Sequence, residues 1–381
     1  KKSKKNRYSV YEARIAIFFI YCPNYEILEI EFFTFLSIKR PKSRYQFMTI
    51  QFDVLGIGNI LMDIIAPVSY DFLKKEGIEK ASMSLIGEER ASVLTSSLLN
   101  QGKVQEIAGG SAANTLFGIN ALGLRSGFIG KVKNDKIGNR IKKSMIDGGV
   151  DFFSSLNKSG PASGRCLIAV TPDGERSMST FLGAACMFTK KDIIKSKIES
   201  ASCVYLEGYL FDTQPAKEAF IQVAKIAKSY GRNIALTLSD SFCVDRHRRS
   251  FQMFINDHVN ILFANKDELL SLYSCEDIET ALNNLSSKKL TACITDGKSG
   301  SVIQSGTERH YINSCPVKNI VDTTGAGDQY AAGVLAGRAF GLSWPDSGYL
   351  GSIAAAEVVS HYGARPLSNI NESLNQFMPN N

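Results

Sequence analysis

The residues best suited to chemistry lie in one glycine-rich string near the C-terminus, DTTGAGDQ at residues 322–329. Gly325 and Gly327 allow a sharp turn that presents consecutive backbone N–H groups at the start of a predicted helix over residues 326–340. Such N–H groups and the helix dipole together bind anions. Asp328 adds a carboxylate to this anion site, which suits a general base beside a transferring phosphoryl group.

A structural interpretation of the same string must be weighed against the catalytic one. Asp328 would then only stabilise the first turn of a helix through its dipole. A bare GAGD would leave the two interpretations evenly matched, but the eight-residue string is more specific. A second glycine-rich string, GGSAAN at residues 109–114, also precedes a predicted helix, over residues 111–122. The two strings together favour the catalytic interpretation.

DTTGAGD resembles the C-terminal signature of the ribokinase, or PfkB, superfamily of sugar and nucleoside kinases, and GGSAAN resembles its N-terminal signature. The strings occur in the family's order, and the resemblance extends over about residues 52–368. The resemblance implies an ATP-dependent kinase that uses Mg²⁺, with a monovalent cation as a further candidate. It also implies that Asp328 accepts the proton of the attacking hydroxyl, while the N–H groups of Gly325, Ala326 and Gly327 stabilise the transferring group.

The resemblance places the acceptor-binding residues near the start of the folded region. Asn59 and Asp63 follow the first predicted strand, and the family uses an Asp here to accept hydrogen bonds from two sugar hydroxyls. Gly109 and Gly110 would allow close approach of a polyol, and Asn114 offers both a donor and an acceptor. A loop cap for Asp63, a helix-start turn for the glycines and a surface position for Asn114 are the structural alternatives.

The donor side is expected after the later strands. Asn265 and Glu268 match the family's NxxE element, in which the Glu acts on Mg²⁺ through water, although they also suit a helix N-terminus. Thr295, Gly297 and Gly300 match the family's TxGxxG turn beside the ATP phosphates.

Two details limit the nucleotide-site interpretation. The tripeptide GKS at residues 297–299 imitates the end of a P-loop, but Ala292 replaces the required glycine and a strand follows instead of a helix. Many relatives also carry an Asn eleven residues before a late Gly-Ala pair. Here the pair is at residues 363–364 and Ser352 occupies that position, which weakens any detailed claim about adenine contacts.

The strings around these motifs are most similar to adenosine kinases, notably GNILMDI at residues 58–64, EGYL at 207–210 and LSDSF at 238–242. We therefore expect phosphorylation of a primary hydroxyl of a nucleoside, adenosine to AMP. Phe181, Leu182 and Phe211 are candidates to line a base pocket, although core packing is the simpler role for each. The alternative within the family is a kinase for ribose, fructose or a keto-deoxy sugar acid.

Two hypotheses from other classes remain. A non-catalytic sugar or nucleoside sensor on the same fold is disfavoured because Asp328 and the GAG turn are both present. A dehydrogenase is disfavoured because Gly56 and Gly58 begin a dinucleotide motif whose third glycine is replaced by Leu61.

The elements needed to position these motifs alternate between apolar strands and helices from residue 52 onward. This pattern predicts a ribokinase-like α/β fold, with a doubly wound, mostly parallel sheet, helices on both faces and a small β lid. Residues 165–171 and 176–182 predict a β-hairpin through the PDGE turn between them. We expect the lid within about residues 64–108 and 150–185. Residues 245–249, DRHRR, are expected to form a solvated helix start.

Composition gives no reason to expect nucleic acid or membrane as a partner. The net charge is +7, but residues 1–47 hold ten of the 44 Lys and Arg residues and only four of the 37 acidic residues. The remainder is nearly neutral, which does not favour nucleic-acid binding. The partner expected is therefore a small nucleoside or sugar, with the protein a monomer or homodimer. The dispersed cysteines, without a CxxC pair, fit reduced thiols in the cytoplasm.

The N-terminal region differs from the rest of the sequence. Its apolar run at residues 15–22 is shorter than the ~20 residues of a bilayer span. We expect residues 1–47 to be a poorly ordered extension and residues 48–381 to be the kinase domain, with Met48 as a natural start.

Overall fold

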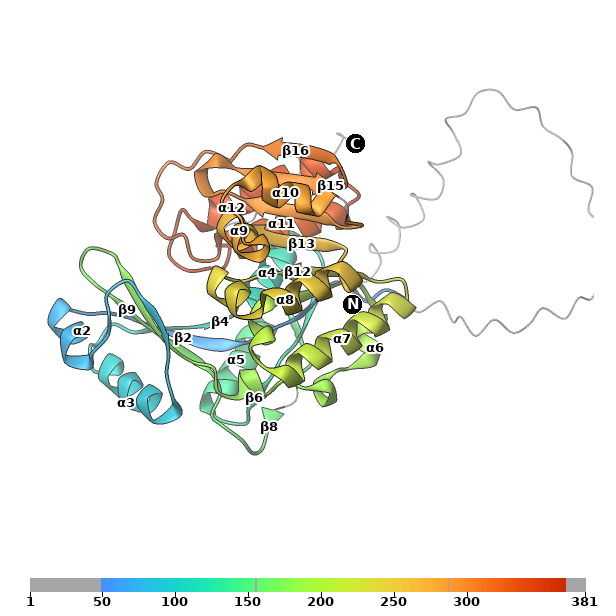
Figure 1. The fold of residues 1–381 in the computed structure, drawn as a ribbon. Helices are drawn as coiled ribbons and strands as arrows, with labels where there is room; N and C mark the ends of the chain where they lie inside the picture. The colour runs from blue at the N-terminus through green and yellow to red at the C-terminus, as the bar shows by residue number, and fades with distance from the viewer. Residues whose placement is uncertain (1–48, 155, 287, 368–381) are drawn as a thin grey trace, which may run out of the picture. The chain divides into compact units, whose positions relative to one another are not determined.

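The computed structural model describes residues 49–154, 156–286 and 288–367 (Figure 1). Residues 1–47, expected to form an extension, lie outside the described residues. Most strands belong to one nine-stranded sheet with the order β16-β15-β14-β13-β12-β11-β1-β5-β7. In chain order they are β1 (Phe52–Ile57), β5 (Ser126–Ile129), β7 (Asp151–Phe152), β11 (Ala201–Glu207), β12 (Asn233–Thr237), β13 (Ile261–Asn265), β14 (Thr291–Thr295), β15 (Ser301–Ser305) and β16 (Glu308–Ile312).

The pairing of strands in this sheet is parallel from β7 to β14 and antiparallel for β15 and β16. Successive strand residues point to opposite faces, so both faces of the parallel strands are apolar. Tyr205 and Phe263 enter one core, whereas Val204 and Leu262 enter the other. This alternation is the physical reason that helices cover both faces.

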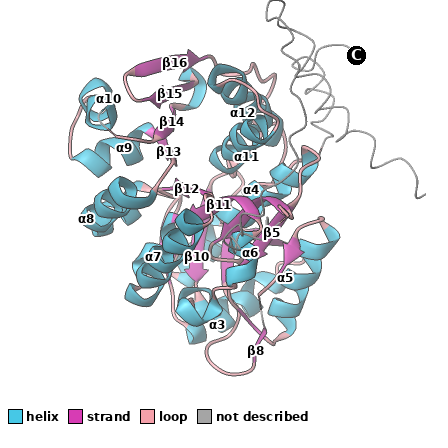
Figure 2. Ribbon diagram, turned by 90° about the vertical axis from the view of Figure 1, so that its right-hand side faces the viewer, coloured by secondary structure: helices cyan, strands magenta, loops and turns pink. Residues whose placement is uncertain are grey.

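The helices form two layers, which Figure 2 shows on opposite sides of the strands. The first layer packs in the core that contains Tyr205, and its members are α4 (Ser111–Ala121), α5 (Lys136–Asp147), α11 (Ala326–Ala339) and α12 (Trp344–Val358). The second layer packs in the other core, and its members are α6 (Lys195–Glu199), α7 (Gln214–Ser229), α8 (Ser241–His258), α9 (Lys266–Tyr273) and α10 (Ile278–Ser286). The predicted doubly wound α/β fold is confirmed.

A second sheet of five strands has the order β3-β10-β9-β2-β4. Its strands are β2 (Leu61–Pro67), β3 (Met83–Leu85), β4 (Gln105–Gly109), β9 (Arg165–Val170) and β10 (Arg176–Phe181). Helices α2 (Tyr70–Glu76) and α3 (Glu88–Leu99) accompany it, and Figure 1 shows this sheet extending to one side of the main one. A two-stranded pair, β6 (Val132–Lys133) with β8 (Leu156–Asn157), completes the strands of the described residues.

The predicted hairpin is present as the antiparallel pair β9 and β10. The loop position considered for Asp63 is not found in the structure. Leu61 begins strand β2, which pairs with β9 and β4, so Asp63 lies within a strand of the second sheet. The reason is that β1 leads through a short glycine-containing turn directly from one sheet into the other. Within the described residues, no helix combines the length and apolar character needed to cross a bilayer.

Candidate active site

The Asp328 carboxylate lies in the first turn of α11 and joins two distant strings of the sequence. Its Oδ1 accepts a hydrogen bond of 2.6 Å from Ser111 Oγ, and its Oδ2 accepts one of 3.1 Å from Asn114 Nδ2. Burial raises the pKa of Asp328, and the two hydrogen bonds act in the opposite direction. The residue as a whole is only partly buried.

The glycine turn before Asp328 has the geometry that the sequence predicted. Gly325 is the N-cap of α11 and has a φ of 80°, which favours glycine. A Cβ at this position would also come within 2.5 Å of Ala364 Cβ. The Ala326 N–H donates to the Thr323 carbonyl at 3.2 Å, so it must change partner before it can serve a phosphoryl group.

Asp63 lies where the second sheet meets the Gly109–Gly110 string. Strands β2 and β4 pair with Leu61 opposite Gly109, and a Cβ on Gly109 would overlap the Asp63 carboxylate. Burial raises the pKa of Asp63 to about 7, with the charges of Arg365 and Arg176 opposing the shift and that of Asp328 adding to it. Gly109 is therefore required so that the carboxylate can occupy this position.

A buried carboxylate that the sequence analysis did not single out holds this region together. Glu207, at the end of β11, is 1% exposed and accepts hydrogen bonds from the backbone N–H groups of Asn59 at 3.1 Å and Ala112 at 2.9 Å. Burial raises its pKa to about 8. Its position at the end of an apolar strand, as the first residue of the quoted EGYL string, was the available signal. Asn59 Oδ1 is buried without a hydrogen-bond partner, so it is available to accept a hydrogen bond from a ligand.

A cavity of about 400 Å³ lies at the start of α11. Its lining includes Thr295, Gly297 and Gly300 from the TxGxxG turn, together with Ala326 and Gly327. Ser352, the position noted for departing from the family pattern, also lines it, and so does an apolar group composed of Pro316, Val317, Ile320, Ala355, Ala356 and Val359. The structure thus brings most of the predicted donor residues into one largely apolar hollow.

Asn265 and Glu268 are not among the residues that line this cavity, although Asn265 pairs with Thr295 across β13 and β14. The two form a capping box at the start of α9, in which Glu268 accepts hydrogen bonds from the Asn265 backbone N–H at 3.1 Å and from its Nδ2 at 2.8 Å. Burial raises the pKa of Glu268 to about 7. Asn265 and Glu268 therefore cap the start of α9, as the structural alternative predicts. If Glu268 also acts on a metal ion, it must do so while it makes these capping hydrogen bonds.

Comparison with known proteins identifies the family. The model of the pfkB family of carbohydrate kinases matches residues 78–371 of the chain. The chain belongs to the PfkB family. It is therefore a phosphotransferase with an alcohol group as acceptor, and kinases of this family use ATP.

Similar proteins cover most of this PfkB kinase but are named for different substrates. A probable sugar kinase from Rhizobium etli is 41% identical, with a TM-score of 0.79, over 87% of this chain and 99% of the other. Adenosine kinase from Sinorhizobium meliloti is 40% identical, with a TM-score of 0.79, over 86% of this chain and 99% of the other. A 5-dehydro-2-deoxygluconokinase from Geobacillus thermodenitrificans is 25% identical over 71% of this chain and 83% of its own length.

Arg176 connects the second sheet of the PfkB kinase to the DTTGAGD string, and the sequence analysis missed it. It stands at the start of β10 and donates to Asp322 Oδ2 at 2.6 Å and to Thr324 Oγ1 at 3.1 Å. Burial raises the pKa of Asp322, but hydrogen bonds from the Gly363 and Thr324 amides and the charge of Arg176 outweigh it and leave this pKa below its usual range. Arg176 therefore fastens the second sheet to the DTTGAGD string, a few residues before the candidate base.

Replacing Arg176 by Met should lower kcat/KM for the acceptor by about tenfold, because a charge-assisted contact worth about 1.5–3 kcal/mol is lost and Asp322 is left without its cation. Steady-state kinetics would measure this. Arg309→Met is the matched control, since Arg309 also pairs with a carboxylate, that of Glu279, but on α10. Equal kinetics in the two variants would contradict a role for Arg176 in joining the second sheet to the DTTGAGD string at the site.

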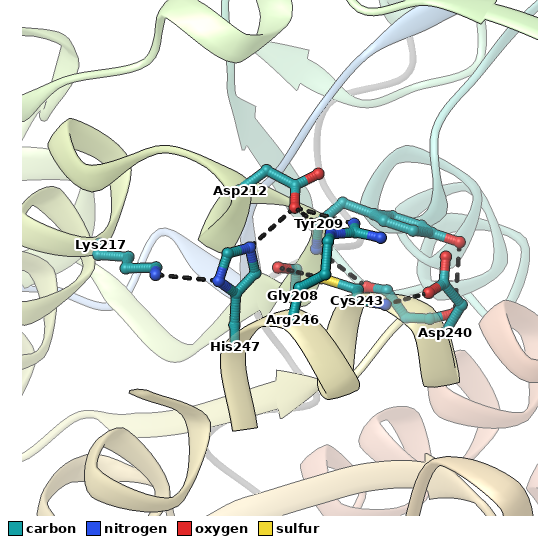
Figure 3. A network of polar contacts seen from close by, with 9 residues as sticks. Gly208, Tyr209, Asp212, Lys217, Asp240, Cys243, Arg246 and His247 are labelled. Atoms are coloured by element: carbon teal, nitrogen blue, oxygen red, sulfur yellow. Dashed lines mark hydrogen bonds and ion pairs between the residues drawn. The ribbon is translucent and has the colours of Figure 1, made fainter. Parts of the chain in front are cut away.

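The DRHRR segment lies within α8, which begins at Ser241, and it contains a kink at His247, where two helical stretches join. Figure 3 shows its polar network: His247 Nε2 contacts Asp212 Oδ1 at 2.9 Å, and its Nδ1 contacts Lys217 Nζ at 3.1 Å. Arg246 donates to the same Asp212 oxygen at 2.9 Å. The cluster is thus only partly solvated, because it ties α8 to the segment after β11.

Two of the three side chains considered for a base pocket belong to the hydrophobic cores. Phe211 is 2% exposed and stacks on Phe251 with ring centroids 4.1 Å apart, so it belongs to the core. Phe181 is buried in the other core, against Arg165. Leu182 is only partly buried.

Proposed function

We propose that this PfkB kinase transfers the γ-phosphoryl group of ATP to the primary hydroxyl of a nucleoside, with adenosine converted to AMP. The position of the Asp328 carboxylate carries the proposal. It accepts hydrogen bonds from Ser111 and Asn114 of the GGSAAN string. It also belongs to the helix turn whose residues Ala326 and Gly327 line the cavity on the donor side. A carboxylate between an acceptor region and a donor cavity has the placement that a general base needs.

The acceptor would be held where the two sheets meet. Asp63 presents two acceptor oxygens to sugar hydroxyls, and Asn59 Oδ1, buried and without a partner, is a further acceptor there. Gly109 and Gly110 allow close approach of the sugar, and Asn114 orients it next to Asp328. As the hydroxyl attacks, its proton passes to Asp328, whose raised pKa makes it a better proton acceptor than an ordinary carboxylate.

The donor would occupy the cavity that contains Thr295, Gly297 and Gly300. In this arrangement the N–H groups of Gly325, Ala326 and Gly327, at the start of α11, would serve the transferring group, once the Ala326 N–H has left the Thr323 carbonyl. Their partial positive charge and the dipole of the helix would stabilise its developing negative charge. Positioning and electrostatics of this kind account for most of the catalysis of phosphoryl transfer.

The side chains near the donor cavity could hold Mg²⁺ only through water. Among the described residues, no three His, Cys, Asp or Glu side chains group so as to hold a metal ion. Mg²⁺ retains several waters and binds substrate phosphates, so one nearby carboxylate acting through water is sufficient. Glu268 is that carboxylate in our proposal, with Asn265 beside it, and the ion would supply neutralisation of phosphate charge. A monovalent cation is a further candidate that activity with and without K⁺ would test.

The choice of a nucleoside has specific support. The chain is 40% identical to the adenosine kinase from Sinorhizobium meliloti, and its GNILMDI, EGYL and LSDSF strings resemble that branch. The probable sugar kinase from Rhizobium etli is just as similar, and the Geobacillus relative is named for a keto-deoxy sugar. A sugar or sugar-acid acceptor is therefore the second candidate.

A panel of acceptors tests this proposal directly. Purified protein with ATP and Mg²⁺ should convert adenosine to AMP with kcat/KM at least about 100-fold above that for ribose, fructose or 5-dehydro-2-deoxygluconate, because a pocket built for a nucleoside gains the binding energy of the base. Coupled ADP release and chromatography of the product would measure it. Preferred phosphorylation of a sugar would establish the second candidate, and no ADP release with any acceptor would contradict kinase activity on these classes.

A further inference from the structure

Three consecutive residues near the C-terminus, Gly363–Arg365, contact both halves of the candidate site. The Gly363 N–H donates to Asp322 Oδ2 at 2.9 Å, in the string that carries Asp328. The Ala364 carbonyl accepts a hydrogen bond of 3.0 Å from Gln329 Nε2, which also donates to the Asn114 carbonyl at 2.9 Å. The segment thus holds the start of α11 against α4.

Arg365 extends these contacts to the acceptor side. Its guanidinium lies 3.6 Å from the centre of the Phe117 ring on α4, donates to Ser144 Oγ on α5 at 3.0 Å, and donates to the Ala108 carbonyl on β4. A planar guanidinium can stack on a ring and donate from its edge at the same time, which a lysine cannot do. One side chain therefore joins two helices to the last residues of β4.

The Ala108 carbonyl is the last backbone group before Gly109, so fixing it fixes the glycine that abuts Asp63. In addition, the Arg365 charge is close enough to lower the pKa of Asp63, against the larger effect of burial. The other charged or titratable groups that act on this carboxyl are Arg176 from β10, Asp328 from α11 and the Cys166 thiol from β9. Of the two cations, Arg176 is already paired with Asp322.

We propose that Arg365 is a positioning residue for the acceptor, which fixes the Ala108–Gly109 backbone and helps to keep the Asp63 carboxylate charged for hydrogen bonding to sugar hydroxyls. The proposal rests on the proposed function of Asp63 as the acceptor-binding carboxylate. In this proposal the contact between residues 363–365 and β4 contributes to substrate binding. A purely structural contact would only stabilise the fold.

The sign of the expected pH effect follows from the direction of the shift. The pKa of Asp63 is raised to about 7, so acceptor binding by the charged form is present above this pH and is lost as the pH falls through it. Removing the Arg365 charge removes a cause that lowers this pKa. The acidic limit of acceptor binding should then move to higher pH.

Adenosine binding without ATP, measured by calorimetry from pH 5.5 to 9, and steady-state kinetics test the proposal in three variants. Arg365→Met should raise the Kd and KM for adenosine about tenfold and move the acidic limit up by about one pH unit, with the KM for ATP unchanged. Arg365→Lys, which retains the charge but not the fork of donors, should raise Kd while leaving the acidic limit in place. Arg338→Met is the matched control, because Arg338 stacks on Trp344 and donates to the Leu342 carbonyl away from the site.

An Arg365→Met protein with the adenosine Kd and acidic limit of the Arg338→Met control would overturn the proposal. So would an Arg365→Lys protein whose acidic limit moves, a result that remains decisive if the Met variant does not fold. The wild-type panel separates this failure from that of the proposed function. An active wild type with unaffected Arg365 variants refutes only the role of Arg365, whereas a wild type that phosphorylates a sugar redirects the same measurements to that sugar.

Discussion

Asp328→Asn should lower turnover by about 100-fold or more while folding and ATP binding remain close to wild type. The amide has nearly the same shape as the carboxylate but cannot take the proton of the attacking hydroxyl. It also meets two donors, Ser111 Oγ and Asn114 Nδ2, with only one acceptor oxygen. Single-turnover kinetics would measure the chemical step, and calorimetry with ATP would measure donor binding.

Asp346→Asn is the matched control, because Asp346 is also an acidic residue in the first turn of a helix, α12. If Asp328 only stabilises the dipole of its helix, the two variants should lose similar, small amounts of stability and keep their activity. Near-normal turnover of Asp328→Asn would therefore refute its assignment as the base and favour the structural interpretation of the GAGD turn.

Gly109→Ala should reduce kcat/KM for the acceptor by about 100-fold, because misplacement of a substrate-binding group by about 1 Å has effects of that size. The added methyl group would overlap the Asp63 carboxylate, and Gly109 is buried within the pairing of β2 and β4. The carboxylate must then rotate away from the acceptor. ATP binding should be unchanged, since the donor cavity is lined by other elements.

Gly87→Ala controls for a glycine substitution in the same region. Gly87 precedes α3 with a φ of −79°, and no atom lies within 4 Å of an added Cβ. This variant should keep wild-type kinetics. Gly109→Ala with unchanged kcat/KM for the acceptor would show that Asp63 does not need its present position, and would remove it from the acceptor site.

The elements that could be predicted from the sequence are those governed by neighbouring residues. The turn at Gly325 and the helix after it follow from glycine conformation and from the spacing of small residues within eight positions. The hairpin of β9 and β10 follows from the PDGE turn between two apolar runs. The two helix layers follow from strands whose residues on both faces are apolar.

The sequence did not predict strand β2 as part of a second sheet. No local pattern in its residues indicates to which sheet they belong. Leu61–Pro67 continues closely after β1, and a single sequence cannot show that the chain passes there from one sheet to another. The same limit applies to Arg176, Glu207 and Arg365. Each is an ordinary charged residue in the sequence, and its partners lie between 95 and 257 residues away.

By itself, the sequence determined the chemistry available to this protein: a carboxylate in a glycine-rich anion turn, a second glycine string, and strands apolar on both faces. These features are local, because backbone conformation and side-chain alternation depend on adjacent residues. Only the tertiary structure decided which of the charged residues meet. Burial gives Asp63, Glu207 and Asp328 their raised pKa values, and the cations of Arg176 and Arg365 act on Asp63 from segments far apart in the chain. Burial and charge proximity are properties of the packed molecule, and no spacing along the chain specifies them.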